Sequence, residues 1–409
     1  MLTARRHFHS ILVGLALATA LAARAQIDPH KRELVQLGYN QAFEGHAPLA
    51  AYAFYFLNKP DFIRSNLTLR LAVAPVYLDS EVGVSQALGP NTDLGFGLAG
   101  GGYADSYSEI REGNYKTQES FDGHSGEVSV NVYHRFNPAQ RVPLNAILRG
   151  EAHYSAFTDS DDTNPGFELP QSQPIFFIRS GLRLGGQEPL MLPELAMEVS
   201  IWYQGQFRTH SGAYGYGNDR QLNPTTHQFL GRGLFAYTHT NSGQALRLNL
   251  TLGDSIHADR FSAYRLGGFL PLASEFPLDL PGYYFQEISA RRFALLGANY
   301  EVQLGRGRRV SALLSAATAG VDYIAGLKQP GGDRLSGVGA GLIYRSKRNA
   351  WQALVAYGYG IDALRNGEPG AHSIGFLVQF DLDRAGLGLL GPGESPNFSR
   401  ALRRILNLF

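Results

Sequence analysis

The chain of 409 residues contains no cysteine, which excludes a disulfide framework and thiol chemistry. Its formal net charge of +1 gives no excess of basic residues, so we expect no nucleic-acid partner. The mean hydropathy is −0.16, and beyond the first residues no apolar run is long enough to cross a membrane as a helix. The sequence therefore excludes a helical membrane protein.

The first 25 residues have the order of a secretory signal peptide. Arg5 and Arg6 precede the apolar run ILVGLALATALA, and the small-residue pattern Ala23-Arg24-Ala25 follows it. This run is too short for a membrane anchor. We expect residues 1–25 to be removed by cleavage and the remaining chain to be exported.

Alternation of apolar and polar residues dominates the rest of the chain, which also has 48 glycines, 21 tyrosines and 24 phenylalanines. In QALRLNLTL, for example, a leucine occupies every second position from Leu246 to Leu252. Such alternation is typical of strands with one apolar and one polar face. Because the strands are roughly ten residues or longer, they suit a bilayer crossing at a tilt.

The polar faces of these strands carry charges that suit a water-filled lumen, namely Arg149, Glu151, Glu198, Arg232 and Glu301. Together with export and abundant aromatic residues, they predict an all-β transmembrane antiparallel β-barrel of the Gram-negative outer-membrane type, over residues 26–384. We therefore expect location in the outer membrane, with lipid around the barrel.

Short and long connections alternate along the chain, as periplasmic turns and outer loops do in such barrels. The short connections are predicted at 89–92, 137–141, 186–190, 240–243, 305–308 and 346–350. The longer loops are predicted near 106–121, 157–172, 209–224, 257–290, 323–333 and 363–370. With hairpins in 34–57 and 66–89 this gives about sixteen strands, although residues 34–48 could instead form a short helix.

The tail of residues 385–409 departs from the strand pattern. Ser399 can cap a short helix with Leu402, Ile405 and Phe409 on one side. We expect either this amphipathic helix in the periplasm or a frayed end.

The stretch from Tyr264 to Phe285 is rich in both apolar residues and proline, and it lies in the sixth predicted outer loop. It contains the segments Arg265-Leu266-Gly267-Gly268 and Leu280-Pro281-Gly282-Tyr283. The last predicted strand has Ser373, Gly375, Phe376, Val378 and Phe380 in a polar-x-Gly-x-x-apolar-x-aromatic order. In position and residues these features resemble the bacterial surface antigen superfamily of BamA- and TamA-type barrels.

The resemblance implies that the sixth loop folds into the barrel, where its apolar side chains are sheltered. It also implies that the final strand is a signal that the barrel assembly machinery recognises. Two positions depart from the family pattern: Pro281 replaces the arginine of the loop tip, and Thr318-Ala319-Gly320 replaces the acidic wall motif. Because the arginine and its acidic partner are both absent, neither leaves a buried charge without a partner. Alternative contacts could come from Arg265, Arg291, Arg292 and Asp322.

Few residues lie between Gln26 and the first strand pattern, so we expect neither the POTRA domains of the family nor a patatin-like lipase domain. A full insertase role is correspondingly disfavoured. The cargo is not indicated by any motif.

Candidate catalytic and metal-binding motifs favour structural interpretations, and we expect neither an enzyme nor a bound cofactor or metal. His239 and Ser242 lie in good hairpin-turn chemistry, and Gly123-His124-Ser125-Gly126-Glu127 lacks the last glycine of a nucleophile elbow. The acidic stretch of residues 159–162 lacks the glycine and terminal glutamate of an EF-hand loop.

The sequence therefore favours a role in outer-membrane organisation or in the passage of material. A general porin is the second hypothesis, and a lipid-modifying barrel enzyme is the third. An inward-folded sixth loop favours the first, an acidic constriction loop in an open lumen the second, and a wall-mounted His-Ser pair the third.

Overall fold

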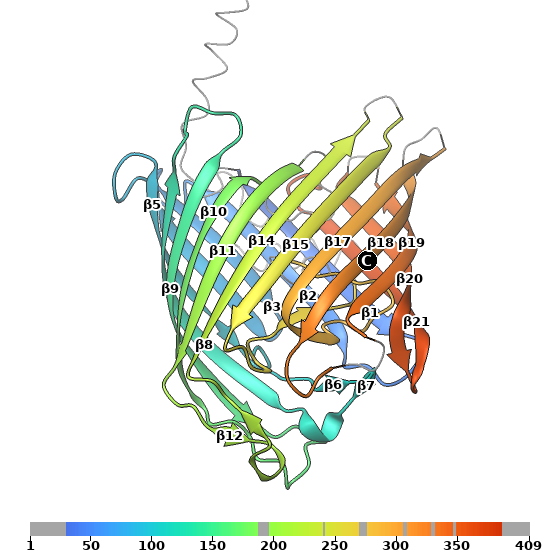
Figure 1. Ribbon diagram of the computed structural model, residues 1–409. Coiled ribbons are helices and arrows are strands. Elements are labelled where there is room, and N and C mark those ends of the chain that lie inside the picture. The colour runs from blue at the N-terminus through green and yellow to red at the C-terminus, as the bar shows by residue number, and fades with distance from the viewer. Residues whose placement is uncertain are drawn as a thin grey trace, which may run out of the picture.

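The computed structural model describes residues 30–186, 196–239, 242–269, 276–305, 309–328, 332–346 and 349–386, which form a closed β-barrel (Figure 1). Sixteen strands make the wall, each antiparallel to its neighbours: β1 (Arg32–Ala42), β2 (Ala50–Pro60), β3 (Leu67–Ala74), β4 (Tyr77–Val84), β5 (Thr92–Gly101), β8 (Asp122–Arg135), β9 (Leu144–Thr158), β10 (Gln173–Gly185), β11 (Ala196–Arg208), β14 (Thr225–Thr238), β15 (Ala245–Ile256), β17 (Ile288–Leu304), β18 (Val310–Tyr323), β19 (Arg334–Arg345), β20 (Trp351–Arg365) and β21 (Glu368–Asp381). The fold class predicted from the sequence is confirmed.

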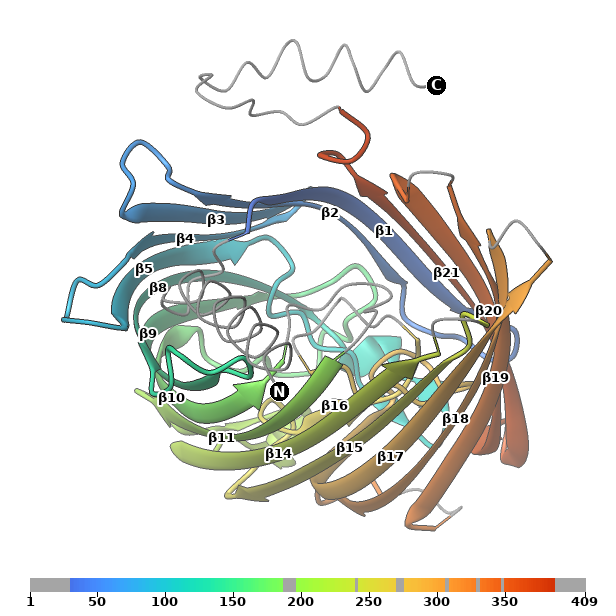
Figure 2. The same ribbon diagram turned by 90° about the horizontal axis from the view of Figure 1, so that it is seen from above.

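The barrel closes where the first and last strands meet. β1 pairs with β21 over nine residue pairs, from Leu34↔Asp381 to Ala42↔Ser373. Figure 2 shows the resulting ring of strands, with β1 beside β21. Closure leaves no open sheet edge between first and last strand, as a wall in contact with lipid requires.

Strand alternation divides the side chains between lipid and lumen. The leucines of β15 are exposed on the outside, from 38% at Leu246 to 47% at Leu252, whereas Arg247 and Thr251 point inward between them. The same alternation places Val128 and Val130 outside and Asn131 inside on β8. The lumen is therefore lined by polar groups, which avoids their burial in lipid.

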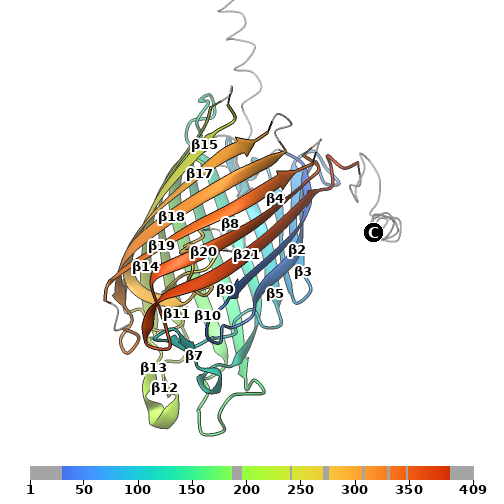
Figure 3. The same ribbon diagram turned by 90° about the vertical axis from the view of Figure 1, so that its right-hand side faces the viewer.

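One end of the barrel carries short turns and the other carries long loops. The long loops are L3 (102–121), L4 (159–172), L5 (209–224) and L6 (257–287), and they contain the small elements β6 (Ile110–Arg111), β7 (Asn114–Tyr115), η1 (Thr117–Glu119), β12 (Ala213–Tyr214), η2 (Tyr216–Asn218), β13 (Arg220–Gln221) and β16 (Tyr264–Leu266). β12, β13 and β7 project from this end in Figure 3. Since short turns are periplasmic in barrels of this type, the loop end is the outer one.

The hairpin expected at 34–57 is confirmed, because residues 34–48 form β1 and the loop after it and not the alternative short helix. One expectation about the connections is wrong. The long loop expected at 363–370 is a two-residue turn between β20 and β21, in which Asn366 and Gly367 have φ angles of 53° and 87°. Asn-Gly favours two positive φ angles and therefore a tight hairpin.

Among the residues that the structure describes, no helix is long and apolar enough to cross a membrane. The predicted signal peptide and nearly all of the predicted tail, from residue 387 onward, lie outside the described residues. Parts of the predicted turns at 186–190, 240–243, 305–308 and 346–350 lie outside them as well.

Candidate functional site

L6 turns back into the barrel instead of standing above it. Its segment β16 pairs with the first residues of β17, from Tyr264↔Ala290 to Leu266↔Ile288. The next residues then fold against the segment near Leu280, because the Gly267 N–H donates to the Leu278 carbonyl (3.0 Å) and the Leu280 N–H to the Gly268 carbonyl (3.1 Å). L6 is therefore a folded hairpin with its own backbone pairing.

The Gly-Gly pair at the start of this hairpin has a steric reason. Gly267 and Gly268 have φ angles of 128° and 77°, which side chains disfavour. A methyl group on Gly268 would also lie 2.6 Å from the Phe285 Cα atom. This turn therefore requires glycine.

The tip of L6, Pro281-Gly282, lies against the inner face of the wall. Its floor is formed by glycines of two neighbouring strands, Gly337 and Gly339 of β19 and Gly358 and Gly360 of β20. A methyl group on Gly358 would come within 2.6 Å of the Gly282 nitrogen, and one on Gly337 would overlap the Pro281 carbonyl. The absence of side chains on these strands provides the space that the tip occupies.

Apolar side chains of L6 fill the space between loop and wall. Leu266, Leu280 and Tyr283 are fully buried, and they share one cluster with Phe293 and Leu295 of β17. All of the residues predicted for the inward loop thus lie together in L6, against the inner face of the wall. Their action as a plug stays a prediction.

A buried ion pair holds the end of L6 to the wall. The Arg365 guanidinium at the outer end of β20 donates to both Glu287 carboxylate oxygens, at 2.9 and 3.0 Å. Their side chains are 3% and 0% exposed. Glu287 also accepts from the Tyr284 N–H (2.8 Å), and Arg365 lies 3.6 Å from the Tyr284 ring centre. Charge, hydrogen bonds and ring contact all connect L6 to β20.

The sequence did not reveal this pair, and the alternatives it suggested make other contacts. Arg265 donates to the Ser289 hydroxyl and to the Ser108 carbonyl of L3. Arg291 and Arg292 are exposed outside the barrel, where they pair with Asp322 and Asp254.

The Thr318-Ala319-Gly320 segment of β18, which replaces the acidic wall motif of the family, does not direct its first side chain towards L6. Thr318 is exposed on the outer face of β18, whereas Ala319 is the residue that faces inward. No acidic side chain of this motif meets the loop.

The outer loops pack over the mouth of the barrel around an aromatic cluster. Tyr107 and Phe121 of L3, Phe167 of L4, Tyr214 of L5 and Phe261 of L6 form its centre. The ring centres of Tyr107 and Phe261 are 5.0 Å apart, and those of Phe121 and Phe261 5.8 Å. Rings at these distances attract one another beyond simple burial. The loops therefore form a lid with a core of its own.

Buried charges tie the same loops together. The Glu109 carboxylate of L3 is fully buried and accepts from Arg260 of L6, with Arg220 of L5 3.6 Å away. Glu119 of L3 accepts from Arg220 as well. Tyr107 donates to Glu109 (2.5 Å), and burial together with this carboxylate raises the pKa of Tyr107 to about 12. Removing Glu109 would leave the Arg260 guanidinium without this buried carboxylate, which is costly.

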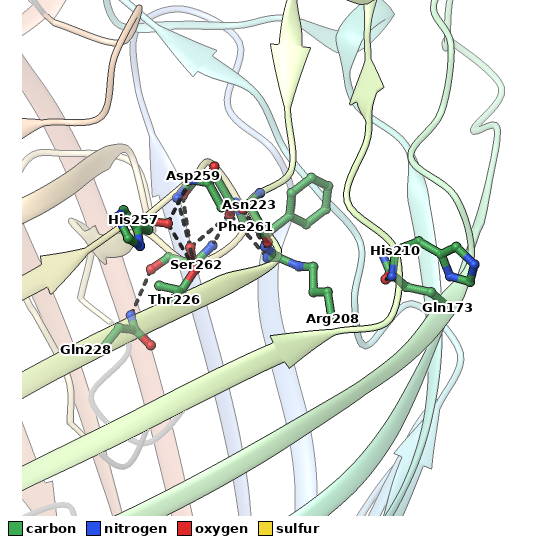
Figure 4. Close-up of polar contacts among 10 residues, drawn as sticks. All are labelled: Gln173, Arg208, His210, Asn223, Thr226, Gln228, His257, Asp259, Phe261 and Ser262. Carbon is green, nitrogen blue, oxygen red and sulfur yellow. Dashed lines mark hydrogen bonds and ion pairs between the residues drawn. The ribbon is translucent and has the colours of Figure 1, made fainter.

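A second buried contact joins L6 to the rim of the wall (Figure 4). Arg208 at the end of β11 donates to Asp259 of L6 at 2.5 Å, and both side chains are nearly inaccessible. Asp259 also accepts from the backbone of Asn223 in L5 (3.0 Å) and of Ser262 (3.0 Å). The carboxylate is therefore saturated and fixes L5 and L6 together.

Another part of L6, at Phe276, contacts β10, β11 and β14, away from the strands that hold the loop tip. Phe276 lies between the guanidinium groups of Arg179 and Arg232, at 5.4 and 5.6 Å from its ring centre, and beside the Trp202 ring. Asp279 is half-buried. Desolvation raises its pKa to about 7, against the opposing effect of Arg232.

One His-Ser pair is mounted on the wall, which the sequence analysis did not identify. His153 and Ser155 face the lumen from β9, with 3.1 Å between Nε2 and the hydroxyl. Asp105 of L3 accepts from both side chains, and Ser155 is only 3% exposed. Because the carboxylate occupies the nitrogen that would deprotonate the serine, the arrangement fixes L3 to the wall.

The other candidate motifs have structural positions. His239 and Ser242 lie 2.9 Å apart in the turn between β14 and β15. Gly123 to Glu127 lies within β8 without a following helix. Asp159, Asp161 and Asp162 are in L4, and the described part of the chain contains no group of three or more residues arranged to bind a metal.

The predicted assembly signal lies in β21, between β1 and β20. Phe376, Val378 and Phe380 lie on the outer face, whereas Ser373 and Gly375 face inward. Its recognition by an assembly machinery stays a prediction.

A closed wall of this size with an outward aliphatic belt and a polar lumen defines a transmembrane β-barrel of the bacterial outer-membrane type. Within that class, this barrel is distinguished by an inward-folded sixth loop and a packed lid.

Comparison with solved structures supports this class. The chain is similar in fold to CdiB from Acinetobacter baumannii (TM-score 0.53, 11% identity, 86% of this chain and 60% of that chain). It is also similar to CdiB from Escherichia coli (0.55, 10%, 86% and 63%). A BamA from Haemophilus ducreyi lacking POTRA domains 1–3 matches with a TM-score of 0.52 (9% identity, 85% and 70%).

This chain spans less than two thirds of the length of the CdiB structures. No protein-family profile matches the sequence, and no curated protein is significantly similar to it. The resemblance to BamA-type barrels is confirmed as a likeness of fold.

Proposed function

We propose that this protein is a gated outer-membrane barrel with a role in membrane organisation, through whose lumen material passes when L6 and the lid are displaced. The observation that carries the proposal is the docking of the L6 tip on the glycine floor of β19 and β20. A loop that served only as an outer cap would need no such floor. The likeness in fold to CdiB and BamA supports the same class of role.

The attachments of L6 are suited to a gate. The tip makes close but uncharged contacts, whereas the buried ion pairs of L6 lie away from the tip, Glu287–Arg365 at the loop's end and Asp259–Arg208 and Arg260–Glu109 near its start. Leaving the glycine floor would therefore cost the tip packing contacts but none of these ion pairs.

Planar bilayers test the proposal. The intact protein should show little or irregular conductance, and deletion of residues 269–281 should produce a larger, steadier current. Deleting Asp161 and Asp162 from the exposed part of L4 is the control and should leave the current unchanged. Large steady conductance from the intact protein, unaltered by the loop deletion, would contradict a gate.

The second candidate is a permanently open porin-like channel. It is favoured by the acidic side chain of L6, because Asp279 lies near Arg232 of β14, as an acidic residue of a constriction loop would. Under this function the intact protein conducts steadily.

We further propose that outer-membrane lipid surrounds the aliphatic belt and that the barrel assembly machinery recognises β21 during biogenesis. The outward row Phe376, Val378 and Phe380 supports both partners.

A further inference from the structure

The charges that face the lumen are unevenly divided between two sides of the barrel. On β10 to β19, arginines outnumber glutamates among the inward-facing described residues: Arg179, Arg183, Arg208, Arg232, Arg247 and Arg345 against Glu198 and Glu301. We call this side the basic wall. Arg208 of this set is paired with an acidic residue of a loop, Asp259.

Glu198 is shared between two arginines, whereas Glu301 is held by one. Glu198 lies 3.1 Å from Arg183 and 3.9 Å from Arg232. Both oxygens of Glu301 accept from Arg345, at 2.6 and 2.9 Å. Among the described inward-facing residues of this wall, arginines therefore exceed glutamates.

Arg247 lies beside the second of these pairs. It faces the lumen from β15, opposite Asn299 of β17. Its Nε atom is buried and reaches no hydrogen-bond acceptor among the residues that the structure describes. The nearby carboxylate, Glu301, already has both oxygens engaged by Arg345. A buried cationic donor without an acceptor is unfavourable unless an anion reaches it.

The adjoining side of the lumen, on β3 to β9, has the reverse character. Glu127 and Glu151 flank the single Arg149 at 2.7 and 2.8 Å. On β4, Asp79 and Glu81 both lie near Arg70, at 3.8 and 4.0 Å. Carboxylates exceed arginines here, so a field runs across the lumen from the basic wall to the acidic one.

L6 covers part of the basic wall while it is docked. Phe276 stacks on Arg179 and Arg232, and Asp279 brings a carboxyl group to Arg232. An acidic group of the chain itself thus stands where an anion from outside would bind. Displacing L6 would expose this wall to whatever enters the lumen.

We propose that the barrel passes anionic solutes along the basic wall and that Arg247, near the turn end, is a binding position on their path. Carboxylate and phosphate groups fit the guanidinium fork. The inference rests on the proposed passage through the lumen and adds the class of substrate.

The test measures ion selectivity in planar bilayers across a potassium chloride gradient, using the 269–281 deletion so that the lumen conducts. The reversal potential should show preference for chloride. Arg232→Gln combined with Arg247→Gln should reduce or reverse that preference. The matched variant on the other wall, Glu127→Gln with Glu151→Gln, should increase it. A cation preference, or one that the arginine variants leave unchanged, would overturn the inference.

Inorganic phosphate is the second probe. It should reduce the chloride current of the deletion variant, and Arg247→Gln should raise the half-blocking concentration by about tenfold, as for a lost charge-assisted hydrogen bond. Equal block with and without Arg247 would rule out that residue as a binding position. A current without selectivity contradicts only this inference, whereas no current in any variant contradicts the proposed passage as well.

Discussion

Replacing Arg365 with alanine should release L6 from the wall. The change leaves Glu287 as a lone buried charge, since its side chain is fully covered and both its oxygens had been paired with Arg365. Breaking a buried pair in this way costs about 3–5 kcal/mol. If this cost falls on docking, the undocked population should rise at least about a hundredfold, because about 1.4 kcal/mol corresponds to tenfold.

The absence of cysteine in the chain provides a clean assay. Leu280→Cys places a thiol at a fully buried position of L6, where maleimide labelling requires opening of the loop. When opening and closing are fast relative to labelling, the labelling rate follows the open population. Arg365→Ala in the Leu280→Cys background should therefore label at least about a hundredfold faster than Leu280→Cys alone.

Two matched variants decide whether the buried pair is responsible. Arg292→Ala removes an exposed pair, with side chains 65% and 53% exposed, and should change the rate little because solvent screens such pairs. Arg365→Met with Glu287→Leu removes both charges and should restore most of the protection. An unchanged labelling rate in Arg365→Ala, or an equal effect of Arg292→Ala, would refute the reasoning.

Three further predictions concern the tip, the lumen and the last strand. Gly337→Ala should increase labelling of Leu280→Cys, because its methyl group overlaps the Pro281 carbonyl, whereas Gly233→Ala, which faces open space, should not. The raised pKa of Asp279 means that the docked loop holds a proton more tightly, so docking should weaken as pH rises from about 4 to 7 and then stay level. Conductance should accordingly be lower at pH 5 than at pH 8, and Asp279→Asn should remove the difference; the opposite trend would show that the carboxyl is not desolvated on docking. Phe380→Asp places a charge on the lipid face, so the protein should fail to insert and be degraded, while Phe380→Leu should insert and show heat-dependent gel mobility. Normal surface levels of Phe380→Asp would show that insertion does not require an apolar side chain at position 380 of β21.

Local patterns in the sequence were sufficient for most of the wall. The leucine alternation of β15 and the hairpin chemistry after β14 fix strands by short-range rules. The same rules explain the one loop that was predicted too long. Asn366-Gly367 is a sequence typical of a tight turn, but the alternation of short and long connections favoured a long loop at this position.

Contacts between distant residues could not be found in this way. Glu287 and Arg365 are 78 residues apart, and nothing near either residue indicates the other. The loops that form the lid look polar in the sequence, because the five aromatic residues of its cluster are isolated positions spread over four loops. The His153–Ser155 pair had one usable signal, since residues two apart on a strand share a face.

The docking of the L6 tip on the inner wall is most directly tested by cross-linking. The Pro281 Cβ atom lies 3.6 Å from the position of a Cβ atom on Gly339, within the range of a disulfide. Pro281→Cys with Gly339→Cys should form this bond in isolated outer membranes under mild oxidation. Ser315→Ala removes the hydroxyl beside position 339, and the Tyr357 carbonyl oxygen, 2.9 Å from the new Cβ position, must shift slightly. Pro281→Cys with Gly233→Cys on the outer face should not. Absence of the first cross-link, with both thiols freely labelled, would show that the loop tip lies elsewhere.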